Sequence, residues 1–166
     1  LQVNAVQTAV LYGEAVRLLA PKSAETVVDA YCGVGTISLL LSAHAGRVIG
    51  IESVEPAVRD AERNTAENGC TNVSFHVGNV EDILPSLGAP IDALVVDPPR
   101  KGCDPAVLQA IIAAAPKRVV YVSCGAPTLA RDAKLLAEGG YAAEKVQCVD
   151  MFCWTGAVET VMCFSK

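Results

Sequence analysis

Short, nearly unbroken hydrophobic runs alternate along this chain with longer segments in which polar residues are interspersed. The runs are rich in Val and Ile, which is typical of parallel strands buried on both faces. They predict strands over residues 26–30, 47–51, 73–77, 91–96 and 118–122. The longer segments predict helices over residues 36–45, 55–68, 105–115 and 128–138, and an amphipathic segment over residues 5–19 predicts one more before the first strand. This order predicts a doubly wound α/β sheet.

The C-terminal segment departs from this alternation. Residues 142–149 and 158–164 are two strand-like runs with no helix-length segment between them, so they should pair as an antiparallel hairpin at the sheet edge. A parallel α/β core that ends in such a hairpin resembles the Rossmann-like class I methyltransferase fold, with its seven-stranded, mostly parallel sheet, rather than a dinucleotide dehydrogenase. No internal repeat or linker divides the chain, so residues 1–166 are expected to form one domain.

Composition narrows the class of protein. The 166 residues are 52% hydrophobic with a mean hydropathy of +0.38, which is enough for one buried core. The longest apolar runs are far shorter than the roughly 20 residues that cross a bilayer, and no cleavable leader is recognised, so we expect a soluble cytoplasmic protein without membrane contact. Seven cysteines without a Cys-x-x-Cys pair and only two histidines argue against a disulfide framework or a metal site.

The first predicted strand leads into a glycine-rich turn, DAYCGVG at residues 29–35, directly before a helix. Gly33 and Gly35 allow the backbone to approach a ligand closely, because glycine lacks a Cβ. The dinucleotide-binding fingerprint has a third glycine three residues later, where this chain has Ser38. Glu52 ends the second strand, where such sheets place an acid that binds ribose hydroxyls. A tight turn and a solvated strand end are the alternative interpretation.

The fourth strand runs into DPPRKG at residues 97–102, which we call the ledge. It lies at the carboxyl edge of the sheet, where ligands bind in this architecture. Pro98 keeps Asp97 extended, and two prolines with fixed φ angles make the segment stiff. Arg100 stands where amino-group methyltransferases with a related motif usually carry an aromatic residue that stacks on the target base. This difference argues against that class.

A cysteine follows the fifth strand and directly precedes a helix, in SCGAPTLARD at residues 123–132. We expect the partial positive charge of the helix start, with Arg131 one or two turns in, to favour the thiolate of Cys124 and therefore its nucleophilicity. A cysteine in such a place is by itself more often a small buried residue. The surrounding motif is what favours a catalytic role.

Together these motifs resemble the catalytic domain of the RNA uracil-5-methyltransferase family, whose members modify transfer RNA or 23S ribosomal RNA. The resemblance covers essentially the whole chain, from QVN at residues 2–4 to DMF at residues 150–152 and the Val-Glu pair at residues 158–159. It implies that Cys124 is the nucleophile and Glu159 the base. The residues expected at the S-adenosylmethionine site are Gln2, Tyr31, Gly33, Gly35, Thr36, Glu52, Asn79 and Asp97.

The chain departs from the family pattern at four places. Gly125 and Ala126 follow the cysteine where the family commonly has Asn-Pro, and residues 153–154 read Cys-Trp where it often has Pro-His. Ala157 stands where a His often precedes the Val-Glu pair. Thr36 occupies a position where Asn is usual.

The implied reaction explains why both a cysteine and an acid are needed. Carbon 5 of uracil is a poor nucleophile, so a thiolate adds to carbon 6 and creates an enolate that can attack a sulfonium methyl. A base must then remove the proton on carbon 5 before the cysteine leaves. In a strand over residues 158–164, Glu159 shares its face with Val161 and Cys163. If that face is dry, desolvation raises the pKa of Glu159 and makes it a better base.

The expected substrate is a uridine splayed out of the stack in folded RNA, with 23S ribosomal RNA favoured over transfer RNA. The 13 basic and 18 acidic side chains give a net charge of −5, the wrong sign for holding RNA by electrostatics alone. We therefore expect an N-terminal RNA-binding region outside this chain, OB-like in the family, to contribute to RNA binding. Two alternatives stay open: methylation of an exocyclic amine of RNA, which needs no cysteine, and a non-catalytic module that binds the cofactor and presents RNA.

Overall fold

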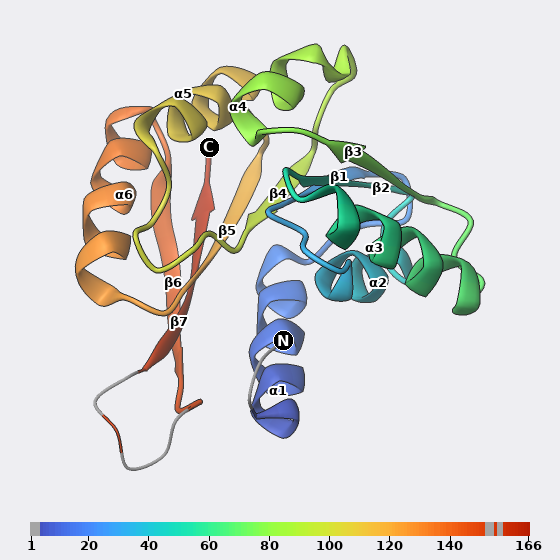
Figure 1. Cartoon of the computed structure of the whole chain (residues 1–166). Coiled ribbons are helices and arrows are strands. Elements are labelled where there is room, and N and C mark those ends of the chain that lie inside the picture. Colours follow the sequence, from blue (N-terminus) through green and yellow to red (C-terminus); the bar gives the residue numbers. More distant parts are fainter. Residues whose placement is uncertain (1–3, 152–154, 156–157) are drawn as a thin grey trace.

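The computed structural model describes residues 4–151, 155 and 158–166. Its centre is a seven-stranded sheet in the order β3-β2-β1-β4-β5-β7-β6 (Figure 1). The strands are β1 (Thr26–Ala30), β2 (Arg47–Glu52), β3 (Val73–Val77), β4 (Ala93–Val96), β5 (Arg118–Ser123), β6 (Ala142–Val149) and β7 (Glu159–Ser165). Strands β1 to β5 pair in parallel, whereas β7 runs antiparallel between β5 and β6. The predicted fold class, including the C-terminal hairpin, is confirmed.

Helices cover both faces of the sheet, as Figure 1 shows. They are α1 (Ala5–Leu19), α2 (Thr36–Ser42), α3 (Glu55–Glu67), α4 (Val80–Ile83), α5 (Pro105–Ala114) and α6 (Ala126–Glu138), with a 3-10 turn η1 (Leu84–Leu87). Because side chains alternate along a strand, Val27 packs with α1 and α2 on one face. Its neighbour Val28 packs with α4, α5 and α6 on the other face.

Most predicted elements are confirmed to within a few residues, and the differences have local causes. Strand β4 begins at Ala93 rather than at 91, because the side chain of Asp92 turns aside to accept a hydrogen bond from the Thr26 backbone N–H at 3.0 Å. Helix α6 begins at Ala126, two residues earlier than predicted, with Pro127 in its first turn. The helical turns over residues 80–87 were not predicted, because the segment is short and contains Pro85.

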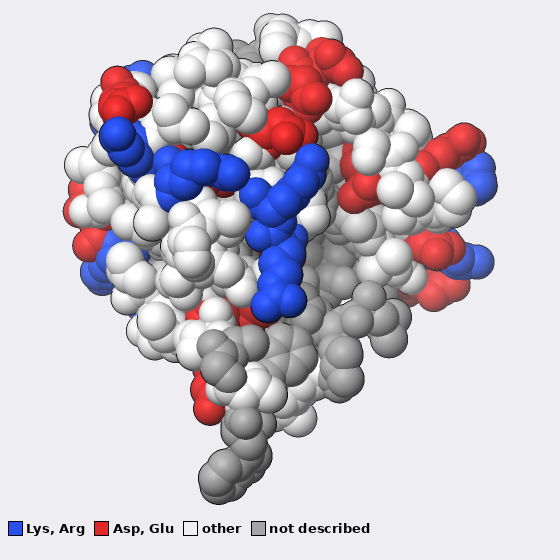
Figure 2. All heavy atoms as spheres, turned by 60° about the vertical axis from the view of Figure 1, so that its left-hand side comes forward, with Lys and Arg blue, Asp and Glu red and all other residues white. Residues whose placement is uncertain are grey.

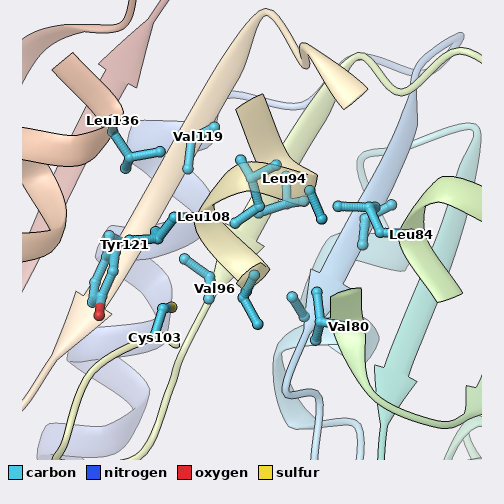
Figure 3. Packing of buried hydrophobic residues seen from close by; sticks show 14 of the residues in the cluster. Val80, Leu84, Leu94, Val96, Cys103, Leu108, Val119, Tyr121 and Leu136 are labelled. Carbon is cyan, nitrogen blue, oxygen red and sulfur yellow. The ribbon is translucent and has the colours of Figure 1, made fainter. Parts of the chain in front are cut away.

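The larger hydrophobic cluster packs β4 and β5 against α5 and α6 (Figure 3). Leu94 and Val119 from neighbouring strands contact this layer together with Leu108 and Leu136 from the helices, and all four are fully buried. Each such side chain contributes about 1.5–3 kcal/mol relative to an exposed position. The cluster therefore fixes the height of α5 and α6 over the sheet and, with it, the loops that precede these helices.

The antiparallel direction of β7 brings its first residue to the edge where β1, β2, β4 and β5 end. In the register of the sheet, Ser123 at the end of β5 pairs with Thr160 near the start of β7. Cys124 and Glu159, one residue further toward that edge on each strand, therefore lie at the same rim. Residues that are 35 positions apart in the sequence are thus placed on neighbouring strands.

Strand β6 forms the far edge of the sheet and is paired only with β7 among the described elements. Its residues are exposed on both faces except Val149 at its end. No helix in the described residues has the length and the apolar character needed to cross a bilayer.

Candidate functional site

The turn after β1 is built by three residues with left-handed backbone angles: Tyr31 (φ 63°), Gly33 (φ 53°) and Gly35 (φ 82°). A Cβ on Gly33 would have no heavy atom within 4 Å, whereas one on Gly35 would meet the Cβ of Ala61 at 3.0 Å. Gly33 therefore borders open space, and Gly35 packs inward against α3. A non-glycine residue with positive φ, such as Tyr31, is uncommon and carries a strain of about 1 kcal/mol or more.

Glu52 at the end of β2 is held against this turn by backbone hydrogen bonds. Its Oε2 accepts from the Gly33 N–H at 3.1 Å, and its Oε1 accepts from the Val54 N–H at 2.9 Å and from the Ser53 hydroxyl at 3.3 Å. The carboxylate is thus oriented before any ligand arrives. Its remaining lone pairs can accept hydrogen bonds from a diol such as a ribose.

Two adjoining hollows lie over the ends of β1, β2 and β4, and both are lined by Tyr31 and Asp97. The first, of about 430 Å³, also includes Glu52 and Asn79 in its wall. The second, of about 770 Å³, includes Gly33 and Thr36 together with residues of α1. Of the residues expected at the cofactor, the structure brings six to one continuous depression: Tyr31, Gly33, Thr36, Glu52, Asn79 and Asp97.

Two expected cofactor residues are not in this depression. Gly35 lies beneath it and serves packing, because the space above its Cα is filled by Ala61 and Phe75. Gln2 lies outside the described residues. The sequence reasoning in turn missed Thr8 and Tyr12 of α1, which line the second hollow. The available signal was the amphipathic pattern of α1, whose inward face carries Tyr12.

Two carboxyl groups with raised pKa values belong to this region: Asp97 in the wall of the depression and Asp29, which is fully buried. Asp97 accepts a hydrogen bond from the Tyr12 hydroxyl at 3.1 Å, and burial, reinforced by the charge of Glu159, raises its pKa to about 6. Asp29 accepts from the Ser38 hydroxyl at 2.6 Å, and its Oδ1 has no partner among the described residues. Burial, with a smaller contribution from Asp97, raises the pKa of Asp29 to about 7.

Cys124 lies beyond this depression, half-buried in a neighbouring hollow of about 670 Å³. Arg100 of the ledge, Thr128 of α6, Cys148 of β6 and Thr160 of β7 contribute to its walls. The turn that carries the cysteine is fixed by the Ser123 hydroxyl oxygen, which accepts from the Gly125 N–H at 3.0 Å. The thiol is therefore accessible from the same edge of the sheet as the cofactor depression.

The expected activation of the Cys124 thiolate by the helix start and Arg131 is wrong in this structure. Burial and the nearby carboxylate of Glu159 raise the pKa of the thiol above its usual value, and Arg100 is the cation that acts against them. Arg131 contributes nothing there, since its Nε donates to the Asp132 carboxylate at 2.7 Å and its Nη2 to the backbone oxygens of Lys101 and Cys103 at 3.1 Å.

Glu159 occupies a dry position at the start of β7. Only 5% of the residue is exposed, and burial raises the pKa of its carboxyl group, with Arg100 as the opposing influence. The expectation that a dry strand face would raise this pKa is confirmed. Arg100 thus acts electrostatically on both Cys124 and Glu159.

The ledge is clamped to α6 by the buried side chain of Asp132. Its Oδ2 accepts from the Tyr121 hydroxyl at 2.6 Å and from the Cys103 N–H at 2.8 Å, and Arg131 completes the network from its outer side. Tyr121 is visible beside Cys103 in Figure 3. A hydrogen-bonded network of this kind is rigid, so it fixes the backbone that carries Arg100 beside the Cys124 hollow.

The donor and acceptor set of the depression fits a cationic ligand that carries a ribose. The carboxyl groups of Glu52, Glu81, Asp97 and Asp104 line it together with Lys101, the backbone at Gly33 is open to close approach, and Oδ1 of the buried Asp29 has no partner among the described residues. Ionised carboxylates accept hydrogen bonds from hydroxyls and amines, and their charge favours a cation over a phosphate. Among the described residues, no group of three or more His, Cys, Asp or Glu side chains could hold a metal ion.

Comparisons with known proteins agree with this chemistry. A family model described as a methyltransferase domain matches residues 21–162. Uncharacterized RNA methyltransferases of Halalkalibacterium halodurans and Listeria innocua are each 52% identical to this chain over 163 residues, which cover 96% of this chain and 36% of theirs. The crystal structure of the Pyrococcus abyssi tRNA (uracil-54, C5)-methyltransferase in complex with S-adenosyl-L-homocysteine superposes with a TM-score of 0.85 at 31% identity, covering 99% of this chain and 39% of that one. The chain spans about a third of the length of the curated relatives it matches.

Proposed function

Because this chain belongs to the methyltransferase-domain family, we propose that it transfers a methyl group from S-adenosylmethionine to carbon 5 of a uridine in RNA. The observation that carries the proposal is the placement of Cys124 and Glu159 on neighbouring strands, beside the cofactor depression and under one cation, Arg100. A transfer to nitrogen needs neither a thiol nor a buried base at this place.

The cofactor supplies an electrophilic methyl group on a positively charged sulfur. Glu52, already oriented by the Gly33 and Val54 amides, accepts hydrogen bonds from the ribose hydroxyls. Gly33 and Thr36 bound the other part of the depression, and Asn79 lines the part next to Glu52. Asp97 lies where the two parts meet and offers a carboxylate to the cationic end of the ligand.

Cys124 performs the first covalent step. Its thiolate sulfur forms a bond to carbon 6 of the uracil, and the electron pair of the 5,6 double bond moves to carbon 5 and the carbonyl oxygen at carbon 4. Carbon 5 becomes the nucleophile that takes the methyl group, and the bond between that methyl and the donor sulfur breaks. Arg100 favours the attacking thiolate, because its positive charge lowers the pKa of the thiol.

Glu159 completes the reaction. Its carboxylate removes the remaining proton from carbon 5, the electron pair of that C–H bond re-forms the 5,6 double bond, and the sulfur of Cys124 leaves carbon 6 as a thiolate. Because burial raises the pKa of Glu159, the carboxylate is a stronger base than a solvated one. The same burial keeps water away from the Glu159 carboxylate.

The relatives support RNA as the substrate and leave its type to be measured. The two curated relatives are described as RNA methyltransferases, and the solved structure is that of an enzyme acting on a transfer RNA uracil. The preference for 23S ribosomal RNA stays a prediction. We also propose that residues 1–166 act as the catalytic domain and that a region outside them shares the grip on RNA, since the relatives are almost three times as long.

The reaction type is tested by following the hydrogen on carbon 5. The natural protein at full length is incubated with S-adenosylmethionine and with ribosomal or transfer RNA that carries tritium at carbon 5 of its uridines. The proposal predicts one tritium released for each methyl group incorporated. Methyl incorporation without tritium release would show that the methyl goes to another atom, as in exocyclic-amine methylation. If the protein binds S-adenosylmethionine but neither methylates nor releases tritium from either RNA, the chain is the non-catalytic module that binds the cofactor and presents RNA.

A further inference from the structure

Four exposed basic side chains form a row next to the Cys124 hollow. Figure 2 shows Lys and Arg groups following one another across one face of the molecule. The row consists of Arg100 and Lys101 on the ledge and Arg131 and Lys134 on α6, and we call it the basic ridge. The side chains of Lys101, Arg131 and Lys134 are 68%, 53% and 78% exposed, so their charges are available to a partner.

Contacts within the structure connect the ridge directly to the reaction site. Arg100 lines the hollow that contains Cys124. The guanidinium of Arg131 donates to the backbone oxygen of Lys101 at 3.1 Å, which ties the outer part of the row to the ledge. Lys134 follows Arg131 by one helical turn on the same face of α6. The row therefore leads from the mouth of the hollow outward along α6, and Lys134 lies about 12 Å along the helix from its first residue.

The ridge differs from the other basic positions of this acidic chain. Arg59 and Arg63 on α3 each pair with an acid on their own helix, and the net charge of the chain is −5. On the ridge, Lys101 and Lys134 carry the same kind of exposed pair, with Asp104 at 3.2 Å and Glu138 at 3.8 Å, and Arg131 pairs with Asp132 at 2.7 Å. The difference lies at Arg100, which lines the Cys124 hollow and has no carboxylate of the described residues within 4.0 Å of its guanidinium.

Arg131 is also preorganised for a phosphate. Its Nε and Nη2 are occupied by Asp132 and by two backbone oxygens, while these bonds leave the two N–H groups of Nη1 for another acceptor. A side chain already fixed in this way loses little rotamer entropy on binding. This arrangement suits a repeated, fixed anion better than a mobile counterion.

From these observations we propose that the basic ridge is the track for the sugar–phosphate backbone of the RNA next to the target uridine, so that the strand leaves the Cys124 hollow along α6. The inference rests on the proposed function, because it takes the occupant of the hollow to be a nucleotide of RNA. Phosphates are the complementary partner, since each contact with Lys or Arg releases a condensed counterion. The ridge supplies local positive charge that the net charge of −5 otherwise denies the domain.

The test compares two matched double variants in the natural protein at full length. Lys101→Gln/Lys134→Gln removes two ridge charges, each with one exposed ion pair to a nearby acid. Arg59→Gln/Arg63→Gln removes two charges with the same kind of exposed pair on α3. For each variant, RNA affinity is measured over a series of salt concentrations. The thermal unfolding midpoint reports on the integrity of the fold, because Lys101 also lines the first cofactor hollow.

The proposal predicts that the ridge variant loses about 1.4–1.8 from the slope of log K against log salt, which corresponds to two phosphate contacts. RNA Kd at low salt should rise at least about fivefold, and the α3 variant should match the unaltered protein. If both variants lose the same RNA affinity and salt slope, or if the ridge variant keeps its slope, the proposal that the ridge binds the RNA backbone is wrong.

Failure of the ridge and failure of the reaction are distinguishable in the same preparations. If the unaltered protein releases tritium from carbon 5 and the ridge variant keeps its salt slope, the track is wrong and the reaction stands. If the ridge variant loses its slope but the unaltered protein releases no tritium, the domain binds RNA along α6 and the reaction is a different one.

Discussion

The two halves of the sheet edge carry opposite chemistry. At the ends of β1, β2 and β4, acids outnumber the single cation, Lys101, in the lining of the cofactor depression, and burial holds the pKa values of Asp29 and Asp97 well above the usual range. At the ends of β5 and β7, a thiol and a single dry carboxyl group lie under Arg100 and next to the basic ridge. One half suits a small cation with a ribose, and the other a polyanion with an electrophilic ring. Asp97 is where the halves meet, because it lines the depression and its pKa responds to Glu159.

The largest expected effect separates the halves by removing the nucleophile. Cys124→Ala should lower turnover by at least about 10³-fold, because the proposed reaction depends on the bond between the Cys124 sulfur and carbon 6. S-adenosylmethionine affinity, measured by calorimetry, should stay within about twofold, since the cofactor half is untouched. Cys70→Ala is the matched control, because Cys70 lies in the loop before β3 and lines neither hollow. Full activity in Cys124→Ala would refute the mechanism.

A second prediction concerns the buried acid of the cofactor half. The pKa of Asp29 is about 7 in the fold against 3.8 for the free group, so between these values the folded protein holds a proton that the unfolded chain releases. Its contribution to stability is therefore full below about pH 4 and is lost as pH rises through about 7, by about 2–4 kcal/mol.

Denaturant unfolding of the unaltered protein and of Asp29→Asn, across pH 4 to 8, measures this contribution. As pH rises, the unfolding free energy of the unaltered protein should fall relative to that of Asp29→Asn. Asp60→Asn, an exposed acid on α3, is the control and should show a much smaller change. A pH-independent difference for Asp29→Asn would mean that the carboxyl group is charged throughout.

The third prediction removes the ribose acceptor. Glu52→Gln should raise the Kd of S-adenosylmethionine about 10- to 100-fold, the equivalent of one charged hydrogen-bonding group worth about 1.5–3 kcal/mol. The reactivity of Cys124 toward iodoacetamide should not change. Glu55→Gln, which removes an exposed acid three residues away that pairs with Arg59, is the control and should leave the Kd within about twofold. Equal Kd values in the two variants would remove Glu52 from the cofactor site.

The smallest effect tests which charges act on the thiol. Alkylation of Cys124, followed by peptide mass spectrometry as a function of pH, should have its midpoint above the usual thiol value, because burial and Glu159 raise the pKa. Arg100→Gln should move the midpoint further up, and Glu159→Gln should move it down, because Arg100 lowers the pKa of the thiol and Glu159 raises it. Arg131→Gln should move it little. A larger shift in Arg131→Gln than in Arg100→Gln would restore the interpretation drawn from the sequence.

The prediction that Arg131 acts on Cys124 shows which parts of the site can be predicted from a sequence and which cannot. Strands β1 and β5 were predicted to within one residue, because nearly all their residues are buried and therefore form continuous hydrophobic runs in the sequence. The order of Cys124 and Arg131 along the chain suggested a nearby cation. In the fold, the Arg131 guanidinium donates a hydrogen bond to Asp132 instead. The cation that lowers the pKa of the Cys124 thiol is Arg100, from another loop.

Burial and cross-strand neighbours explain the remaining differences. Tyr12 reaches Asp97 across 85 positions of sequence, and no local pattern indicates such a contact. The raised pKa of Asp29 depends on how completely α2 and the sheet cover it, which is a property of packing. The raised pKa of Glu159 was anticipated only as a condition on a dry strand face, and the structure supplies that condition.

The covalent bond between Cys124 and the uracil ring is the centre of this account, and a 5-fluorouridine RNA tests it most directly. Fluorine on carbon 5 cannot leave as a cation, so Glu159 cannot release the enzyme after methyl transfer. Intact mass spectrometry of the full-length natural protein with S-adenosylmethionine and such an RNA should show a protein–RNA adduct, absent in Cys124→Ala, with the attachment mapped to Cys124. Methylation of ordinary uridine RNA without any adduct on the fluorinated RNA, or an adduct that maps to Cys148 instead, would contradict it.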